Sequence, residues 1–396
     1  MGKSKKSIAI IGGGIAGITT AYFLAKKHKV ILYDPNGVAE QCSYANGGQI
    51  SVCNAEVWNS YGNIINGIKW LTKADAPLAF RPGVWSWSKV KWIAGFIGAT
   101  ITNKYDYNTR KTIEYSLRSR ELFKDLIDNK IGLEYYDNKC GILHIYKSKK
   151  SWDKARRTLD QFKDTGWGRV ETSSNVIKYS VKSNKVVGAT LTKDDYVGDI
   201  HKFCKSLSGY MQDSSLYDYG FRINKIVRNE EEAKWSNPRD YAIPITKLRK
   251  DFDEVVVCAG AYTPYFLPSL NIYPIKGYSI TYKKARDAPT ISVLDDEKKI
   301  VASPFSNGTF RVAGTAELAD WNHEIREDRI KPLVNWTSEN TFINKDKFEK
   351  WACLRPMTPN MLPVIGKVRG LYVNSGAGHL GWTMGMALAE KIAKDI

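Results

Sequence analysis

The sequence predicts an α/β protein that combines a buried parallel sheet with a region of mainly antiparallel β-structure. Three observations lead to this fold class. A short β-branched run, 7–11, passes directly into a glycine-rich loop and an apolar helix. A second glycine-rich loop, 374–384, precedes another apolar helix near the other end of the chain. Between residues 272 and 335 the pattern changes to short alternating runs separated by turns, which is typical of antiparallel sheet.

The first glycine loop has the spacing of a dinucleotide-binding turn. Gly12 permits the tight turn, Gly14 lets backbone N–H groups approach a pyrophosphate, and Gly17 lets helix and strand pack closely. A second predicted strand ends in Asp34, where a carboxylate can bind both hydroxyls of a ribose. The residues expected at the nucleotide half of a cofactor are Gly12, Gly14, Ile15, Ala16, Gly17 and Asp34. The loop alone does not distinguish FAD from NAD.

Two further segments are expected near such a cofactor. Residues 43–51 are too rich in small and polar side chains for a regular element, and a loop of this kind suits a flat polar ring. The buried parallel strand 254–258 ends in Ala259 and Gly260. This small-residue turn is another backbone surface able to approach a phosphate or a flavin.

The middle of the chain contains both helical and strand patterns. Apolar residues at helical spacing predict a helix over about 104–130. Strands are expected over 133–136 and 141–146. Asp199 precedes an apolar helical segment and is expected to cap it.

The composition is that of a globular protein with an excess of basic residues. The 396 residues are 43% hydrophobic and 25% charged, and the length suits two domains. Lysine and arginine outnumber aspartate and glutamate by 59 to 41, which gives a formal net charge of +18. This charge favours anionic partners, namely acidic lipid, nucleic acid or acidic ligands; the alternative is a solvated basic surface.

The six cysteines show neither a Cys-x-x-Cys pair nor a neighbouring histidine cluster, so no metal site is expected. Reduced thiols in the cytoplasm fit this pattern best. Residues 1–6 run straight into the first strand and leave no room for a signal peptide. The longest aromatic and aliphatic stretch, 92–101, is too short to span a bilayer. We therefore expect a cytoplasmic protein, either free or peripheral at the inner face of the cell membrane.

Five of the twelve tryptophans lie between residues 58 and 101, interleaved with basic residues. This mixture is typical of an interfacial membrane contact, because the indole ring sits at the headgroup level and lysine pairs with anionic lipid. The alternative is that the tryptophans fill the core of a second domain and the lysines cover its outer face. The residues concerned are Trp58, Trp70, Trp85, Trp87, Trp92, Lys69, Lys73, Arg81, Lys89 and Lys91.

Five motifs together resemble a known family. They are 12–17 with Asp34, 45–51, 274–279, 354–359 and 380–384. These motifs resemble the bacterial D-amino acid dehydrogenases of the small-subunit type, within the D-amino-acid oxidase and glycine oxidase superfamily. The resemblance runs nearly end to end, and the later motifs are more specific than the first glycine loop. It implies that the cofactor is FAD rather than NAD.

The resemblance also implies how the chain is divided. A Rossmann-type FAD-binding domain would be assembled from residues 1–65, 186–271 and 351–396. An inserted, mainly antiparallel β (α+β) substrate-binding domain would comprise residues 66–185 and 272–350. The change of pattern near residue 272 agrees with this division.

The resemblance further implies which residues hold the flavin. Val227 would meet the adenine through its backbone, and Ser43, Gln49, Ile50 and Ser51 would line the flavin. Residues 376–384 would place backbone amides and a helix N-terminus at the pyrimidine end of the ring, where reduced flavin carries negative charge. The residues expected here are Ser43, Gly48, Gln49, Ile50, Ser51, Val227, Ala259, Gly260, Gly376, Gly378, His379, Leu380, Gly381, Trp382 and Thr383.

Three residues are expected to act in catalysis or substrate binding. By resemblance, Arg355 clamps the substrate carboxylate with its guanidinium fork; the alternative is a structural salt bridge. Tyr278 would orient the substrate, although an aromatic residue on a strand is also typical of a core. His379 would donate a hydrogen bond to the flavin carbonyl; the alternative is a histidine of a surface loop.

One cysteine departs from the dehydrogenase pattern. Cys353 lies two residues before Arg355, where related sarcosine oxidases carry the cysteine that binds flavin covalently. A covalent link at Cys353 is one hypothesis. The other is a buried free thiol that acts as a small core residue.

The activity implied by the resemblance is oxidative deamination of D-amino acids. A hydride passes from the α-carbon to flavin N5, the imino acid is hydrolysed to the 2-oxo acid and ammonia, and a quinone or other acceptor takes the electrons. The alternatives are an FAD oxidase or dehydrogenase of glycine, sarcosine, D-hydroxyproline or L-amino acids. A non-enzymatic alternative is a basic membrane-binding or nucleic-acid-binding protein. Because the flavin-facing motifs are complete and no nucleic-acid module is recognised, no nucleic-acid partner is expected.

Overall fold

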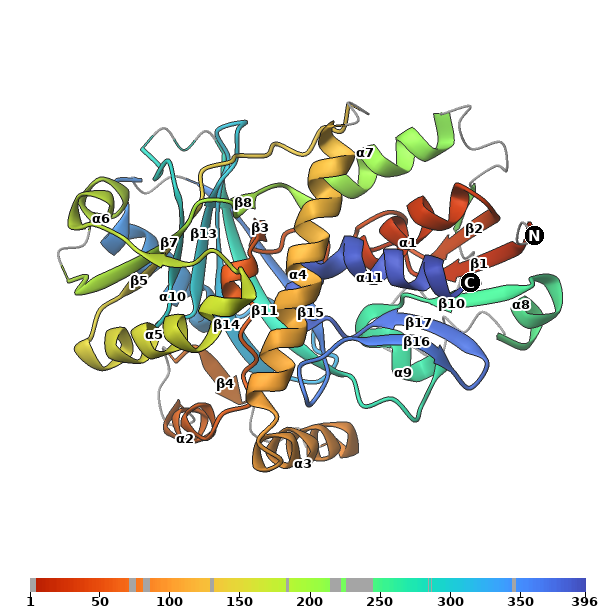
Figure 1. The fold of residues 1–396 in the computed structure, drawn as a ribbon, viewed down its shortest axis with the longest axis horizontal. Coiled ribbons are helices and arrows are strands. Elements are labelled where there is room, and N and C mark those ends of the chain that lie inside the picture. Colours follow the sequence, from red (N-terminus) through yellow and green to blue (C-terminus); the bar gives the residue numbers. More distant parts are fainter. Residues whose placement is uncertain are drawn as a thin grey trace.

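The computed structural model describes residues 5–70, 76–80, 86–128, 132–182, 185–213, 222–225, 245–283, 285, 287–343 and 347–396. Two large sheets occupy opposite ends of the molecule (Figure 1). Both chain termini lie at the end that holds the smaller sheet (Figure 1).

In the described part of the chain, the smaller sheet has six strands and is almost entirely parallel. In spatial order they are β16 (Val364–Val368), β17 (Leu371–Ser375), β10 (Glu254–Val257), β1 (Ser7–Ile11), β2 (Lys29–Asp34) and β9 (Arg222–Lys225). Only β16 runs antiparallel to its neighbour, β17. Apolar, mostly β-branched residues such as Ile8, Ile10 and Val256 are fully buried, because helices cover this sheet. The carboxyl ends of the parallel strands therefore gather at one edge, where cofactors bind in open α/β sheets.

Helices from the two ends of the chain pack against each other on this sheet. Helix α1 (Ile15–Ala25) follows the first glycine loop, and α11 (Gly381–Asp395) follows the second. The Thr19 hydroxyl of α1 donates a hydrogen bond to the carbonyl oxygen of Gly385 in α11 (3.2 Å). The long helix α4 (Tyr105–Asp128) crosses α11 (Figure 1). Its Ser119 hydroxyl accepts a hydrogen bond from Met386 N–H of α11 (3.2 Å).

The larger sheet has nine strands in the described part of the chain. They are β15 (Phe348–Met357), β11 (Tyr273–Tyr282), β14 (Phe310–Leu318), β13 (Ile300–Pro304), β12 (Ser292–Asp295), β5 (Ile142–Tyr146), β7 (Gly188–Thr192) and β6 (Val170–Glu171), with β4 (Leu78–Phe80) beside β14. Most pairs are antiparallel, and only β12–β5 and β14–β4 run parallel. This confirms the predicted fold class.

The remaining helices and a small sheet surround these two sheets. They are α2 (Tyr61–Trp70), α3 (Trp87–Ile101), α5 (Lys149–Phe162), α6 (Ser174–Ser180), α7 (Ile200–Asp213), α8 (Ile245–Asp251), α9 (Thr263–Phe266) and α10 (Glu327–Asn340), with β3 (Gln49–Ile50) paired to β8 (Tyr196–Val197). On α10, Ile330, Leu333 and Trp336 are buried at helical spacing, and the Trp336 indole N–H donates to Asp295 Oδ2 (2.9 Å).

Most of the elements predicted in the middle of the chain are confirmed. The helix expected over 104–130 is α4, and the strand expected over 141–146 is β5. Asp199 caps α7 by accepting a hydrogen bond from Lys202 N–H (3.0 Å). The strand expected over 133–136 is wrong, because Tyr135 packs into the core without joining a ladder.

The expected division into two domains stays a prediction, but the sheet order bears on one boundary. Strand β7 lies within 186–271, the range assigned to the FAD-binding domain, and pairs with β5 and β6 of the larger sheet. Strand β9 lies in the same range and joins the smaller sheet. The chain therefore changes sheets between residues 192 and 222 rather than at residue 186.

The tryptophan and lysine segment divides between the interior and the surface. Trp92 is buried and donates its indole N–H to Met357 O (2.7 Å), and Lys89 is buried in an ion pair with Asp320 (3.1 Å). Trp87, in contrast, is 79% exposed. Lys73, Arg81 and Trp85 lie outside the described residues. No helix in the described ranges combines the length and the apolar character needed to cross a bilayer.

Candidate active site

A cavity of about 980 Å³ runs from the carboxyl edge of the smaller sheet to the face of the larger sheet. Its volume lies at the upper end of the range for ligand pockets. At one end it is lined by the first glycine loop and Asp34, and at the other by strands β5, β11 and β14. The cavity therefore has room for an extended ligand that contacts both sheets.

The glycine loop brings the N-terminus of α1 to the cavity. A Cβ atom on Gly12, whose φ is +109°, would collide with the carbonyl group of Cys258, and one on Gly17 would collide with the carbonyl of Gly12. Gly14, Ile15 and Ala16 line the cavity, while Gly17 lies behind them and keeps α1 close to β1. Backbone N–H groups at a helix N-terminus favour a phosphate anion.

Asp34 stands beside this loop at the end of β2. Its Oδ2 accepts a hydrogen bond from Gly13 N–H (2.7 Å), and its Oδ1 accepts one from Asn36 N–H (2.8 Å). Burial raises the pKa of the Asp34 carboxyl above its ordinary value, and these backbone hydrogen bonds oppose that rise. The carboxyl group lines the cavity next to Gly12, where an acid binds a ribose in nucleotide folds.

The two segments expected at the flavin are joined by hydrogen bonds. The Trp382 indole N–H donates to Gly48 O (3.3 Å). Ser51 N–H donates to the Thr383 hydroxyl (3.1 Å), which in turn donates to Gln49 O (3.4 Å). Residues 43–51 and the start of α11 therefore form one continuous wall, although more than 300 residues separate them in the sequence.

The second glycine loop needs glycine for its backbone shape. Gly376 and Gly378 have φ values of +77° and +60°, which side-chain-bearing residues rarely adopt. A Cβ atom on Gly378 would also press on the Met357 sulfur (2.7 Å). The loop leads into the N-terminus of α11, and Gly381 lines the cavity there. This helix end places positive dipole at the cavity wall.

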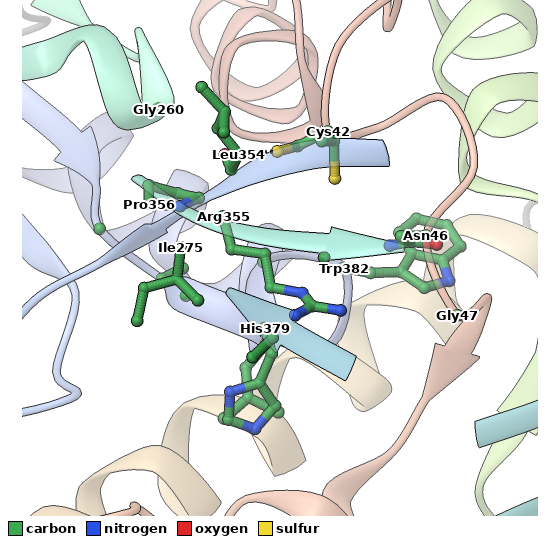
Figure 2. Close-up of a pocket in the computed structure, with 18 of the residues that line it drawn as sticks. Cys42, Asn46, Gly47, Gly260, Ile275, Leu354, Arg355, Pro356, His379 and Trp382 are labelled. Carbon is green, nitrogen blue, oxygen red and sulfur yellow. Dashed lines mark hydrogen bonds between the residues drawn. The ribbon is translucent and has the colours of Figure 1, made fainter. Parts of the chain in front are cut away.

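Arg355 of β15 presents its guanidinium group to the cavity (Figure 2). The group lies over Gly277 of β11, where any Cβ atom would collide with the guanidinium carbon. Nη1 donates a hydrogen bond to Thr315 O (3.2 Å). Among the described residues no carboxylate lies within ion-pair distance of Arg355, so nothing there forms the structural salt bridge considered from the sequence.

Tyr278 follows Gly277 on β11, and its hydroxyl is already engaged. It donates to Glu317 Oε2 (2.5 Å), and Glu317 also accepts from Arg326 (2.7 Å) and pairs with Lys276 (3.3 Å). Burial, followed by this carboxylate, raises the pKa of Tyr278 well above its ordinary value. The ring lines the cavity, but the hydroxyl serves a buried polar network.

His379 lies below Arg355 in the close-up view (Figure 2). Its ring stacks on Trp58, with the centroids 4.8 Å apart. Burial and then the positive charge of Arg355 lower the pKa of His379 to about 4, so the imidazole is neutral at pH 7. Within the described structure its Nε2 atom is buried without a hydrogen-bond partner. His379 is thus part of the cavity wall rather than a surface loop.

Cys42 and Cys353 meet at the cavity near Arg355. The Cys42 thiol donates to Leu354 O (2.6 Å) (Figure 2). A hydrogen bond from Cys42 lowers the pKa of Cys353, and the positive charge of Arg355 acts in the same direction. Cys353 is therefore the more acidic of the two thiols, since the pKa of Cys42 is raised.

Comparison with known proteins identifies the family. The FAD dependent oxidoreductase family, DAO, matches residues 7–394. This chain belongs to that family. D-amino acid dehydrogenase 3 of Mesorhizobium japonicum is 36% identical, with 98% of this chain and 97% of the relative covered. D-amino acid dehydrogenase of Dechloromonas aromatica is 32% identical over 98% of this chain and 96% of its own length.

Solved structures share the fold of this FAD-dependent oxidoreductase. Glycine oxidase from Bacillus cereus superposes with a TM-score of 0.69 at 17% identity, covering 98% of this chain and 94% of its own. Glycine oxidase from Geobacillus kaustophilus gives 0.70 at 14% identity, covering 99% and 95%. At these identities the likeness concerns the fold alone.

The cavity of this oxidoreductase fits FAD. The first glycine loop and Asp34 can hold its nucleotide half, and the wall of residues 43–51 and 376–383 can hold its flavin. A Cβ atom on Gly260, which lines the cavity with φ +55°, would have no atom within 4 Å, so the backbone there is open to a ligand. The FAD preference that the first loop could not settle is thus settled by family membership.

The structure places most of the expected site residues on this one cavity. Those that line it are Gly12, Gly14, Ile15, Ala16, Asp34, Ser43, Gly48, Gln49, Ser51, Ala259, Gly260, Tyr278, Arg355, Gly376, Gly378, His379, Leu380, Gly381, Trp382 and Thr383. Ile50 is buried behind the wall, and Val227 lies outside the described residues. Among the residues that the structure describes, no group of three or more possible ligands is placed to hold a metal ion.

Sequence reasoning missed Arg169, a buried cation on the cavity wall. Its Nε donates to the Thr190 hydroxyl (3.0 Å), and its Nη1 contacts Glu56 (3.1 Å) and Cys53 O (3.2 Å). A single arginine in a glycine-containing loop belongs to no motif, so the sequence does not show that Arg169 lines a cavity. Trp58 was noticed only as part of the segment assigned either to a membrane contact or to the core of a second domain. Its contact with His379 joins residues far apart in the chain, which the sequence does not show.

Proposed function

We propose that this protein catalyses FAD-dependent oxidative deamination of D-amino acids, with Arg355 as the substrate carboxylate ligand. The observation that carries the proposal is the Arg355 guanidinium, which faces the cavity without a carboxylate partner in the described residues. A guanidinium fork matches a carboxylate with two parallel hydrogen bonds. Relatives called D-amino acid dehydrogenase, at 30–36% identity over nearly the whole chain, support the substrate class.

The residues of the chain would orient the substrate for this reaction. When bound, FAD supplies the acceptor for the hydride that leaves the α-carbon. Arg355 would fix the carboxylate and thereby the α-carbon, and the bare backbone of Gly277 allows the guanidinium to lie there. The N-terminus of α11 would stabilise negative charge at the pyrimidine end of the ring. The imino acid product then hydrolyses in water to the 2-oxo acid and ammonia.

Two of the expected catalytic roles change in the light of the contacts. The Tyr278 hydroxyl donates to Glu317, so we assign it to holding β11 and β14 together behind the substrate. The neutral imidazole of His379 lies beside Arg355, and we assign it to the wall of the substrate pocket. A neutral ring leaves Arg355 as the charge that attracts the substrate carboxylate.

A panel of amino acids tests the substrate class. The purified holoenzyme is mixed anaerobically with D-alanine, L-alanine, both proline isomers, D-hydroxyproline, glycine and sarcosine, and loss of the yellow flavin absorbance is followed. We expect D-amino acids to bleach the flavin fastest. Faster bleaching by glycine, sarcosine or an L-amino acid would move the protein to that alternative, and no bleaching by any amine would overturn the class.

We further propose that electrons leave to a quinone and that the protein contacts the inner face of the cell membrane. The support is an apolar surface on α2 and α3. Ile65 and Ile68 of α2 are 53% and 64% exposed, and Trp87 and Ile101 of α3 are 79% and 62% exposed. Each set recurs at helical spacing and so forms one stripe on its helix. Exposed apolar patches of this kind mark interaction surfaces.

A further inference from the structure

The larger sheet has an irregularity beside Arg355, a β-bulge in strand β14. Along the β11–β14 ladder Gly277 pairs with Ala316, but the next residue, Tyr278, pairs with Gly314. Thr315 is therefore the extra residue between these two pairs. Bulges are frequent beside active sites, where they redirect a chemical group away from the regular ladder.

Thr315 adopts a backbone conformation that is unfavourable for its residue type. Its φ is +50°, in the left-handed region, where a β-branched side chain crowds the backbone. Its hydroxyl is also buried, without a hydrogen-bond partner in the part of the chain that the structure describes. Both features cost free energy. They are therefore expected where the conformation of a residue serves a site rather than the stability of the fold.

The carbonyl group of Thr315 is used by the site. In a regular antiparallel ladder, carbonyl groups pair with the neighbouring strand. Thr315 O instead accepts a hydrogen bond from Arg355 Nη1 (3.2 Å), although β11 lies between β14 and β15. The Arg355 side chain crosses β11 over Gly277 and ends at the bulge. Thr315 and Arg355 both line the cavity.

This hydrogen bond holds one side of the guanidinium group. It is the one hydrogen bond that Arg355 makes with the described residues. A guanidinium carries five N–H donors in one plane, so Nε and Nη2 keep their donors for a ligand. Because the group is planar, attachment of Nη1 to a backbone carbonyl restricts rotation of the whole fork. The remaining donors are thus held in a fixed plane before a carboxylate arrives.

We propose that the Thr315 bulge is a positioning element, whose backbone carbonyl holds Arg355 in the orientation that receives the substrate carboxylate. This inference rests on the proposed function, in which Arg355 binds that carboxylate. Thr315 acts through Arg355 rather than on the substrate. An arginine that is held in advance loses less conformational freedom when the substrate binds, and the affinity is higher for that reason.

Deletion of Thr315 tests the bulge, because it restores one-to-one pairing of β11 and β14 without shifting the pairs on either side. In the holoenzyme we expect the KM for the D-amino acid that bleaches the flavin fastest to rise about tenfold. The Kd of benzoate, an unreactive carboxylate, should rise by the same factor when it is measured from the flavin absorbance. In an Arg355→Ala background the deletion should change either quantity less than twofold, since the group that the bulge holds is gone.

Three substitutions separate the carbonyl from the side chain. Thr315→Val removes the hydroxyl and keeps the shape, and Thr315→Gly keeps the bulge and suits a positive φ. We expect both to leave KM within twofold of the wild type, because the carbonyl remains in place. Thr315→Pro should reproduce the deletion at unchanged chain length, because proline cannot adopt φ +50°. Asn103→Pro, at an exposed position with φ +49°, is the matched control and should leave KM unchanged.

The outcomes distinguish this inference from the proposed function. An unaltered KM in the deletion and in Thr315→Pro, or equal increases with and without Arg355, would overturn the positioning role. A tenfold rise in Thr315→Val would assign the effect to the hydroxyl and overturn the role of the carbonyl. If the deletion loses FAD, Thr315→Pro decides with the same two measurements. Failure of D-amino acids to bleach the wild-type flavin would instead overturn the proposed function, whereas the Kd of benzoate would still report on the bulge.

Discussion

Arg355 owes its position to a glycine on the neighbouring strand. Because Gly277 carries no side chain, the guanidinium lies directly on the backbone of β11 and still reaches Thr315 O. The motif 274–279 pointed to this strand, but not to the reason for its glycine. The contact between Gly277 and Arg355 depends on the register of β11 and β15, which a single sequence does not encode visibly.

Removing or displacing Arg355 should weaken substrate binding. We expect Arg355→Ala to raise the KM for the D-amino acid by about 10- to 100-fold, since charge-assisted hydrogen bonds contribute about 1.5–3 kcal/mol. Gly277→Ala should have a smaller effect of the same sign while FAD remains bound. Steady-state kinetics measure the KM for the D-amino acid, and flavin absorbance measures how much FAD remains bound. Arg118→Ala, an exposed arginine on α4, should change neither, and an unaltered KM in Arg355→Ala would contradict the assignment.

His379 should make stability depend on pH. Its folded-state pKa of about 4 lies below the ordinary 6.5, so the unfolded chain binds the proton first as pH falls. Stability from the neutral ring is present above pH 6.5 and is lost between 6.5 and 4, by up to about 3 kcal/mol. Urea unfolding at pH 7.5 and 4.5 should show a smaller loss for His379→Gln than for the wild type. Equal losses of unfolding free energy in the two proteins would contradict a buried neutral ring at His379. The pKa of His144 is also lowered, but this residue is present in both proteins and therefore does not affect the comparison.

Cys353 should be the most reactive thiol. Its pKa is lowered, whereas burial raises the pKa of Cys140, Cys204 and Cys258. Limited iodoacetamide treatment at pH 7.5, followed by peptide mass spectrometry, should find Cys353 modified first. Acid precipitation decides between the two hypotheses for this residue: yellow colour in the pellet would indicate a covalent flavin, and colour in the supernatant a free thiol.

At the scale of elements, the two glycine loops and their helices were the most predictable parts. Glycine spacing and β-branched runs are local signals, and 7–11, 254–258 and the start of α11 follow them. The prediction of a strand over 133–136 was wrong. The apolar pattern is present in the sequence, but no partner strand pairs with these residues. Tyr135 packs on Phe203 instead, with ring centroids 5.7 Å apart. Such a choice is made by tertiary contacts.

The hydrogen bonds between residues 48–51 and α11 should stabilise the cofactor site. Thr383→Val keeps the shape of the side chain and leaves Ser51 N–H and Gln49 O without their partner. We expect a loss of about 1–3 kcal/mol in the free energy of unfolding and a higher dissociation constant for FAD. Thr337→Val, which removes a buried hydroxyl within α10, is the control and should keep the FAD affinity. Equal FAD affinities in all three proteins would contradict this role.

At the scale of the whole molecule, the sequence anticipated the two kinds of sheet and most cavity-lining residues. It did not anticipate where the tryptophan segment goes. On α3, Trp92 faces the interior while Trp87 faces solvent, because the packing of this helix decides which of its faces is covered. Trp58 precedes α2 and is turned inward by its stacking on His379. Arg169 could likewise not be predicted from the sequence, since its partners come from two distant segments, residues 53–56 and Thr190.

The net charge of +18 should govern attraction to a membrane surface. Binding of the holoenzyme to anionic vesicles should fall by at least tenfold between about 50 mM and 500 mM salt, because screening shortens the range of electrostatic attraction. Zwitterionic vesicles should bind more weakly and show little salt dependence. Sedimentation with vesicles measures both, and equal binding to the two vesicle types would contradict an electrostatic contribution.

The position of β17 and α11 has a consequence for biosynthesis. β17 lies inside the smaller sheet between β10 and β16, and α11 completes the wall opposite residues 48–51. Every other described wall of the cavity leaves the ribosome before these residues. Until residues 371–395 have been added, a nascent chain therefore exposes the edge of β10 and lacks the cavity wall opposite residues 48–51.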